Sequence, residues 1–148
     1  MRIALGADHA GVVLKNHIRQ LLDERGISYQ DFGTNSTESV DYPDFAATVA
    51  HEVASGAFDR GILFCGSGVG MAMAANKVAG IRAASVDNED VARLSREHND
   101  ANVLALGERL TPPDAARRIV NAFIDTAFAG GRHQRRVDKI RALDFKGS

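Results

Sequence analysis

Short apolar segments of β type alternate with amphipathic helical segments along almost the whole chain. We expect strands at residues 2–7, 27–32, 60–64, 82–86 and 103–106. The segments between them carry apolar side chains at helical spacing, as Leu14, Ile18 and Leu22 do before Gly26. Such alternation is typical of βαβ units, whose helices cover both faces of a parallel sheet. The sequence therefore predicts a Rossmann-like three-layer αβα sandwich, a fold of the α/β class, with a five-stranded parallel sheet.

The expected helices begin and end at residues that favour helix boundaries. After the first helix, we expect a second to begin near Pro43. Proline is favoured in the first turn of a helix, because the N–H that it lacks would have no partner there. Two more follow Gly70 and Asn88, and another runs from 112 to about 128 with Ala127 on its apolar face. A last helix, from about 133 to 143, follows a flexible pair of glycines. We expect it to pack on a partner subunit.

Size and composition limit the classes of protein to consider. The chain has 148 residues, so we expect one domain over residues 1–148. It has no apolar run near the roughly 20 residues of a membrane span, and Asp8 and His9 interrupt the apolar N-terminal segment. A single cysteine excludes an internal disulfide. We expect a cytoplasmic protein that binds neither membranes nor, at a net charge of −1, nucleic acid.

Polar residues follow several of the predicted strands. Asp8 and His9 follow the first strand, the sequence CGSGVG at 65–70 follows the third, and Asp87 and Asn88 follow the fourth. Ligands of open α/β sheets bind beyond the carboxyl ends of the strands. We therefore expect these residues to converge on one crevice.

The CGSGVG segment combines an anion site with a thiol. Its glycines allow consecutive backbone N–H groups to point into one concavity at a helix N-terminus. It lacks the lysine of a nucleotide P-loop and does not complete the dinucleotide-binding glycine pattern. Cys65 stands beside these donors, which favour its thiolate. A base next to an oxyanion site can remove a proton α to a carbonyl. The alternative is that Cys65 is a buried, small apolar residue.

Further candidate residues lie near the ends of later elements. His98 can exchange a proton near neutral pH, and Asn99 offers an amide, although both could be local cap or turn residues. Arg132 and Arg136 are four residues apart, so one side of a helix could present both to a phosphate, together with His9 or Arg109. The alternative for these arginines is a solvated helix face. No zinc-ligand spacing or carboxylate pair is evident, so we expect no metal and no cofactor.

Six motifs, in this order along nearly the full length, make the chain resemble the ribose-5-phosphate isomerase B family. The wider group includes galactose-6-phosphate isomerase subunits. The motifs are GADHAG at 6–11, DYPDFA at 41–46, CGSGVG at 65–70, AANKVAGIRAA at 74–84, SREHNDANVLALG at 95–107 and GGRHQRRVDKI at 130–140.

The resemblance implies a homodimer, with pairing into tetramers left open, in which each active site uses both subunits. It implies interconversion of ribose 5-phosphate and ribulose 5-phosphate through an enediolate. Cys65 is similar to the family's proton-shuttling base, and His98, helped by Asp8, to its ring-opening acid and base. A subclass without the cysteine uses a glutamate where this chain has Met71. The remaining implied residues are Gly66, Ser67, Gly68, Val69, Gly70 and Asn99 for the enediolate, and His9, Arg109, Arg132 and Arg136 for the phosphate.

Two alternatives remain open at this point. The first is an isomerase of another sugar phosphate, such as allose 6-phosphate, galactose 6-phosphate or a tetrose phosphate, because only the pocket length would differ. The segment 33–42 is a candidate for setting that length. The second is a module that binds a phosphate ligand without converting it.

Overall fold

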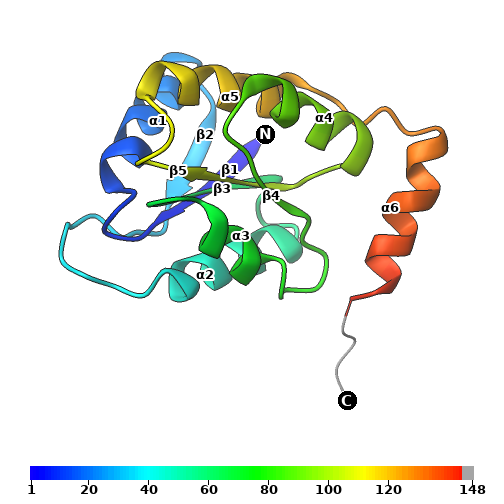
Figure 1. Ribbon diagram of the computed structural model, residues 1–148, viewed down its shortest axis with the longest axis horizontal. Coiled ribbons are helices and arrows are strands. Elements are labelled where there is room, and N and C mark those ends of the chain that lie inside the picture. Colours follow the sequence, from blue (N-terminus) through cyan, green and yellow to red (C-terminus); the bar gives the residue numbers. More distant parts are fainter. Residues whose placement is uncertain (145–148) are drawn as a thin grey trace.

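The computed structural model describes residues 1–144, and its five strands form one parallel sheet in the order β2-β1-β3-β5-β4 (Figure 1). The three inner strands are longer and more deeply buried than the two edge strands. The strands are β1 (Arg2–Ala7), β2 (Ser28–Asp31), β3 (Arg60–Cys65), β4 (Ala83–Ser85) and β5 (Val103–Gly107). The helices are α1 (Val12–Glu24), α2 (Tyr42–Ala54), α3 (Val69–Ala75), α4 (Glu89–Asn99), α5 (Pro113–Asp125) and α6 (Arg132–Ala142).

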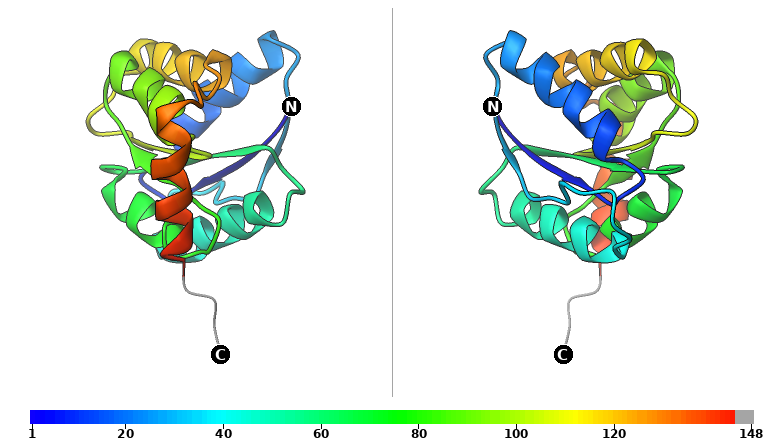
Figure 2. Two further views of the ribbon diagram at one scale, coloured as in Figure 1. Left: turned by 90° about the vertical axis from the view of Figure 1, so that its right-hand side faces the viewer. Right: turned by 90° about the vertical axis from the view of Figure 1, so that its left-hand side faces the viewer.

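Helices cover both faces of the sheet, so the predicted three-layer fold is confirmed. Helices α1, α4 and α5 lie on one face, and α2 and α3 lie on the other (Figures 1 and 2). Alternate strand residues face opposite layers. Phe64 therefore belongs to the core beneath α1 and α5, whereas Leu63 and Cys65 belong to the core beneath α2 and α3.

Several element boundaries differ from the sequence prediction. The helix expected after Gly70 begins at Val69, so Gly70 lies in its first turn. Strands β2 and β4 are shorter than expected, because edge strands find ladder partners on one side. The fifth helix ends at Asp125 instead of near 128, so Ala127 lies outside it. The Arg60 side chain donates to the carbonyls of Phe123 and Ile124, which a longer helix would have used.

The strand register places three loops next to each other at the carboxyl edge of the sheet. Ala7 pairs with Phe64, and Cys65 pairs with Gly107. The loops continue this pairing: the Asp8 N–H donates to the Phe64 carbonyl at 3.1 Å, and the Glu108 N–H donates to the Cys65 carbonyl at 2.8 Å. The residues after β1, β3 and β5 therefore share one surface.

Helix α6 lies outside the three layers, beside α4 (Figures 1 and 2). Its Val137 is buried, whereas Ile140 and Leu143, the residue that follows the helix, are 43% and 84% exposed. The Gly80 N–H donates to the Asp144 carboxylate at 2.8 Å and ties the end of this segment to the body. That α6 packs on a partner subunit stays a prediction. Among residues 1–144, no helix combines the length and apolar character needed to span a membrane.

Candidate active site

Cys65 is the last residue of β3 and lies at the carboxyl edge of the sheet. It is 5% exposed and packs in the apolar cluster beneath α2 and α3. Its sulfur nevertheless has a polar contact, because the Gly68 N–H donates to Sγ at 3.1 Å. A donated N–H stabilises a thiolate more than a thiol. The structure therefore places the sulfur against one amide of the loop, that of Gly68.

The loop after Cys65 turns sharply at Gly68, where the backbone is left-handed with φ of 81°. A Cβ there would also lie 3.0 Å from the Leu106 carbonyl carbon, so glycine is needed for both shape and space. Helix α3 begins at the next residue, and the first amides of a helix have no partner within it. The Val69 N–H uses the Ser67 hydroxyl at 3.3 Å. The turn thus orients amides at the edge where Cys65 ends.

Tyr42, at the start of α2, lies directly over Gly70. A Cβ on Gly70 would come within 2.6 Å of the Tyr42 Cζ and 3.0 Å of its hydroxyl oxygen. The aromatic ring is 40% exposed and forms one wall beside the loop. From the sequence, Tyr42 was a candidate only as the last residue of the segment 33–42, since its position depends on how α2 packs against α3. The available signal was its place in the DYPDFA motif.

Arg109 brings a positive charge to the same loop. Its N–H donates to the Gly66 carbonyl at 3.1 Å, and a Cβ on Gly66 would lie 3.0 Å from its Nη1 atom. The guanidinium therefore lies over Gly66. Gly107, at the end of β5, allows the Ser67 backbone to pack against that strand, because a Cβ there would lie 2.5 Å from the Ser67 carbonyl carbon. Arg109 thus lies beside the glycine loop, and its expected role in binding the phosphate stays a prediction.

Asp8 and His9 follow β1 at the same edge. Asp8 is 6% exposed, and its Oδ1 accepts the Ala10 N–H at 2.9 Å. The His9 Nδ1 accepts the Val40 N–H at 3.1 Å. Within a chain the register thus places Asp8 alongside Cys65, as expected.

The residues after β4 divide between two roles. Asp87 lines a small pocket of 190 Å³ with Ser67 and Thr111 at the carboxyl edge. Asn88 instead caps α4, where its side chain accepts the Val91 N–H at 2.9 Å. Its Oδ1 thus serves the helix and its Nδ2 donates to the Asp87 carboxylate at 3.4 Å, so a role for Asn88 in the crevice stays a prediction.

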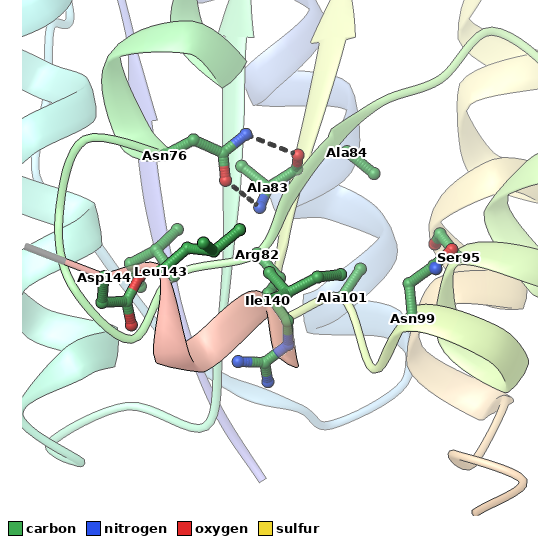
Figure 3. Close-up of a pocket in the computed structure, with 11 residues that line it drawn as sticks. Asn76, Arg82, Ala83, Ala84, Ser95, Asn99, Ala101, Ile140, Leu143 and Asp144 are labelled. Carbon is green, nitrogen blue, oxygen red and sulfur yellow. Dashed lines mark hydrogen bonds between the residues drawn. The ribbon is translucent and has the colours of Figure 1, made fainter. Parts of the chain in front are cut away.

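His98 and Asn99 lie far from Cys65 within one chain. They end α4, which leads back to the amino end of β5, whereas Cys65 pairs with Gly107 at the carboxyl end of that strand. At about 3.3 Å per residue, the strand separates the two edges by roughly 13 Å. Asn99 lines a different pocket of 440 Å³, between β4, α4 and the end of α6 (Figure 3).

His98 stacks on His133 of α6, with ring centroids 4.3 Å apart and an angle of 15° between the planes. Desolvation, followed by the charges of His98 and Arg132, lowers the pKa of His133. Two imidazoles and the nearby arginines therefore form one basic surface on α4 and α6. We call it the basic α4–α6 surface, and its members are His98, Arg132, His133 and Arg136.

The two arginines of this surface have the predicted helical arrangement. Arg132 begins α6, and the Arg136 guanidinium donates to the Arg132 carbonyl at 3.3 Å. Both side chains are exposed. Neither is near Cys65 of its own chain, because α6 lies beside α4 and outside the layers (Figure 1). Across residues 1–144, no group of three or more His, Cys, Asp or Glu side chains could hold a metal ion.

The sequence matches the family described as ribose/galactose isomerase over residues 3–140. The chain belongs to this family. Ribose-5-phosphate isomerase B of Escherichia coli is 50% identical over 143 residues, which are 97% of this chain and 96% of that protein. Family membership confirms the predicted resemblance and the isomerase class.

Two further members bear on the sugar. A structure of ribose-5-phosphate isomerase B from Mycoplasma genitalium with bound ribulose-5-phosphate has a TM-score of 0.92 and 45% identity, and covers 95% of this chain and 94% of that chain. D-erythrulose-4-phosphate isomerase of Pectobacterium atrosepticum is 43% identical over 141 residues, which are 95% of this chain and 93% of that protein. The names of these two relatives thus refer to sugar phosphates of four and of five carbons.

Proposed function

We propose that this isomerase interconverts ribose 5-phosphate and ribulose 5-phosphate, with Cys65 as the base. The observation that carries the proposal is the 3.1 Å contact between the Cys65 sulfur and the Gly68 amide, beside the Arg109 guanidinium. These groups provide a base, amide donors and a positive charge on one edge of the sheet. Relatives of similar length that carry the name ribose-5-phosphate isomerase B support this choice of sugar.

The proposed proton transfer needs few groups. The Cys65 thiolate removes the proton from C2 of the open-chain aldose, and the electron pair moves onto the C1 carbonyl oxygen to give an enediolate. The oxygen is bound, as its charge develops, by amides of the loop 66–70 other than those that donate to Sγ and to the Ser67 hydroxyl. The proton of the C2 hydroxyl then passes to the C1 oxygen, and the thiol returns its proton to C1. C2 thereby becomes the carbonyl of the ketose, and Cys65 is again a thiolate. Met71, which is fully buried and apolar, cannot act as a base.

A complete site requires a second copy of the chain. The basic α4–α6 surface carries the histidine and arginines that ring opening and phosphate binding need, but it lies away from Cys65. We infer that the partner subunit supplies this surface. Exposed apolar side chains on α3, α4 and the α6 segment support such a contact, namely Met73, Leu94, Ile140 and Leu143. Burial of these residues would contribute to the stability of a dimer.

In this arrangement the sugar lies between the two surfaces. Asp8 of the subunit that supplies Cys65 and His98 of the partner subunit open the furanose ring. Asn99 of the partner subunit binds a sugar oxygen. His9 and Arg109 hold the phosphate from one side. The partner's Arg132 and the partner's Arg136 hold it from the other.

The reaction itself can be tested with the wild-type protein in heavy water. Ribose 5-phosphate should acquire deuterium at C2 and ribulose 5-phosphate at C1, because a thiol base exchanges its proton with solvent before returning it. Nuclear magnetic resonance of the recovered sugars would detect this. A protein that binds the sugar without any exchange would instead be the phosphate-binding module considered above.

A tetrose phosphate is the second candidate substrate, favoured by the relative named D-erythrulose-4-phosphate isomerase. The proton transfer would be the same for either sugar, and the length of the pocket would determine which sugar is preferred. Comparison of kcat/KM for four-, five- and six-carbon sugar phosphates distinguishes these substrates. A strong preference for four or six carbons would overturn the choice of ribose 5-phosphate.

Replacing Arg136 with alanine should mainly weaken binding of the phosphate. A charge-assisted hydrogen bond contributes roughly 1.5–3 kcal/mol, so we expect KM to rise about 10- to 100-fold while kcat changes less. Arg135→Ala is the matched control, because it removes an adjacent exposed arginine of the same helix. Steady-state kinetics with ribose 5-phosphate measures both. An unchanged KM in Arg136→Ala would remove this residue from the phosphate site.

A further inference from the structure

Lys15 on α1 has a fully buried side chain, although it carries a charged group. An ammonium in the protein interior is costly unless each of its protons has an acceptor. Three acceptors surround its Nζ: the Asp31 carboxylate at 2.9 Å, the Asn35 amide oxygen at 2.9 Å, and the Thr34 carbonyl. Desolvation lowers the pKa of Lys15, and Asp31 opposes that shift. The three N–H donors and the three acceptors match one to one.

The acceptors lie on the chain that connects β2 to α2. Asp31 ends β2, and Thr34 and Asn35 lie in the first half of the segment 32–41, which passes outside the sheet near its carboxyl edge (Figure 1). Residues 35–39 of this segment are exposed, so packing gives them little support. Asp31 also accepts the Gly33 N–H at 2.8 Å. Residues 32–34 are also bonded to β1, because the Phe32 N–H donates to the Leu5 carbonyl at 2.8 Å and the Thr34 N–H donates to the Ala7 carbonyl at 2.6 Å. Lys15 therefore extends this anchored start to Asn35, the first exposed residue of the segment.

The other end of the segment touches the candidate phosphate site. The Val40 N–H donates to the His9 Nδ1 at 3.1 Å. A ring nitrogen that accepts a hydrogen bond carries no proton, so the neutral His9 ring must carry its proton on Nε2. That nitrogen is then a donor, which is the form required to bind a phosphate oxygen. The position of Val40 thus selects the tautomer of His9.

We propose that Lys15 is a positioning residue, which holds the segment 32–41 so that Val40 keeps His9 as an Nε2–H donor toward the substrate phosphate. The part about phosphate rests on the proposed function, whereas the part about the tautomer does not. Lysine suits this role because its three donors diverge from a single atom, whereas arginine presents a planar fork. No hydrogen bond or ion pair joins the Lys15 side chain to Cys65 or His9 within residues 1–144, so Lys15 acts through the segment.

Three variants of the full chain separate this role from a general effect on folding. Lys15→Met keeps the length of the side chain and removes all three donors. Asn35→Ala removes one acceptor from an exposed position and leaves the core intact. Arg19→Met is the control, because Arg19 also contacts Asp31, at 3.5 Å, but contacts neither Thr34 nor Asn35 by hydrogen bond or ion pair.

The first readout is nitrogen magnetic resonance of the histidine rings at a pH where they are neutral. Wild type and Arg19→Met should show His9 as one tautomer, with the proton on Nε2. Lys15→Met and Asn35→Ala should show a mixture of tautomers at His9, while His17 and His51 remain unchanged. The second readout is KM for ribose 5-phosphate, which should rise about tenfold in Lys15→Met and about threefold in Asn35→Ala, with kcat less affected.

The results separate the possible failures. A single Nε2–H tautomer and an unchanged KM in both Lys15→Met and Asn35→Ala would overturn the proposal. Equal changes in Arg19→Met would also overturn it, since that variant leaves the segment's contacts in place. If Lys15→Met does not fold, Asn35→Ala decides alone. If wild type does not convert ribose 5-phosphate, the proposed function fails, and the tautomer measurement still tests Lys15.

Discussion

Cys65→Ala should abolish turnover while leaving the fold and substrate binding in place. A positioned general base accelerates proton transfer roughly 10²- to 10⁴-fold, and the Cys65 thiol also returns the proton. We therefore expect kcat to fall at least about a thousandfold. The loss in stability should be small, about 1 kcal/mol, because alanine removes one sulfur from the edge of a core cluster. Steady-state kinetics and thermal unfolding measure the two effects.

Two controls show whether Cys65→Ala loses turnover because proton transfer fails or because substrate binding fails. Binding of ribulose 5-phosphate to Cys65→Ala, measured by calorimetry, should stay within a few-fold of wild type, since the amides and Arg109 are untouched. Cys65→Ser keeps the size of the side chain but replaces the thiol with a hydroxyl of far higher pKa, so it should be nearly as inactive. Turnover near the wild-type level in either variant would mean that another group moves the proton.

Much of the fold follows from local patterns in the sequence. The apolar strands, the helix spacing and the glycine loop identified five strands and their carboxyl edge, because each depends on neighbouring residues. The end of α5 could not be predicted in this way. It depends on Arg60, which is more than sixty residues away and whose guanidinium donates hydrogen bonds to the carbonyls of Phe123 and Ile124.

The residues of the candidate site also differ in whether the sequence could predict them. Cys65, Asp8 and Arg109 were predictable, since strand ends in a parallel sheet meet at one edge. Tyr42 and Lys15 were not, because their roles arise from contacts between segments that no spacing reveals. Buried lysine is rare in proteins, and a lysine among apolar helix positions is easily interpreted as the polar edge of the helix. The structure shows instead that its ammonium holds a loop.

Mixing two inactive variants should restore activity if each site uses both subunits. Cys65→Ala lacks the base, and His98→Ala lacks the proposed ring-opening group. In a mixed dimer, one site would contain both substitutions and the other would contain neither, provided that His98 serves the opposite subunit. Unfolding and refolding the variants together allows the subunits to exchange.

The size of the recovery distinguishes shared from separate sites. Random pairing makes about half of the dimers mixed, and one of the two sites in each is intact, so about a quarter of the wild-type kcat should return. Each variant refolded alone should stay inactive. If His98 instead served Cys65 of its own chain, every site in the mixture would carry a substitution, and activity would not return. The position of His98 at the amino edge of the sheet, opposite the Cys65 edge, favours recovery.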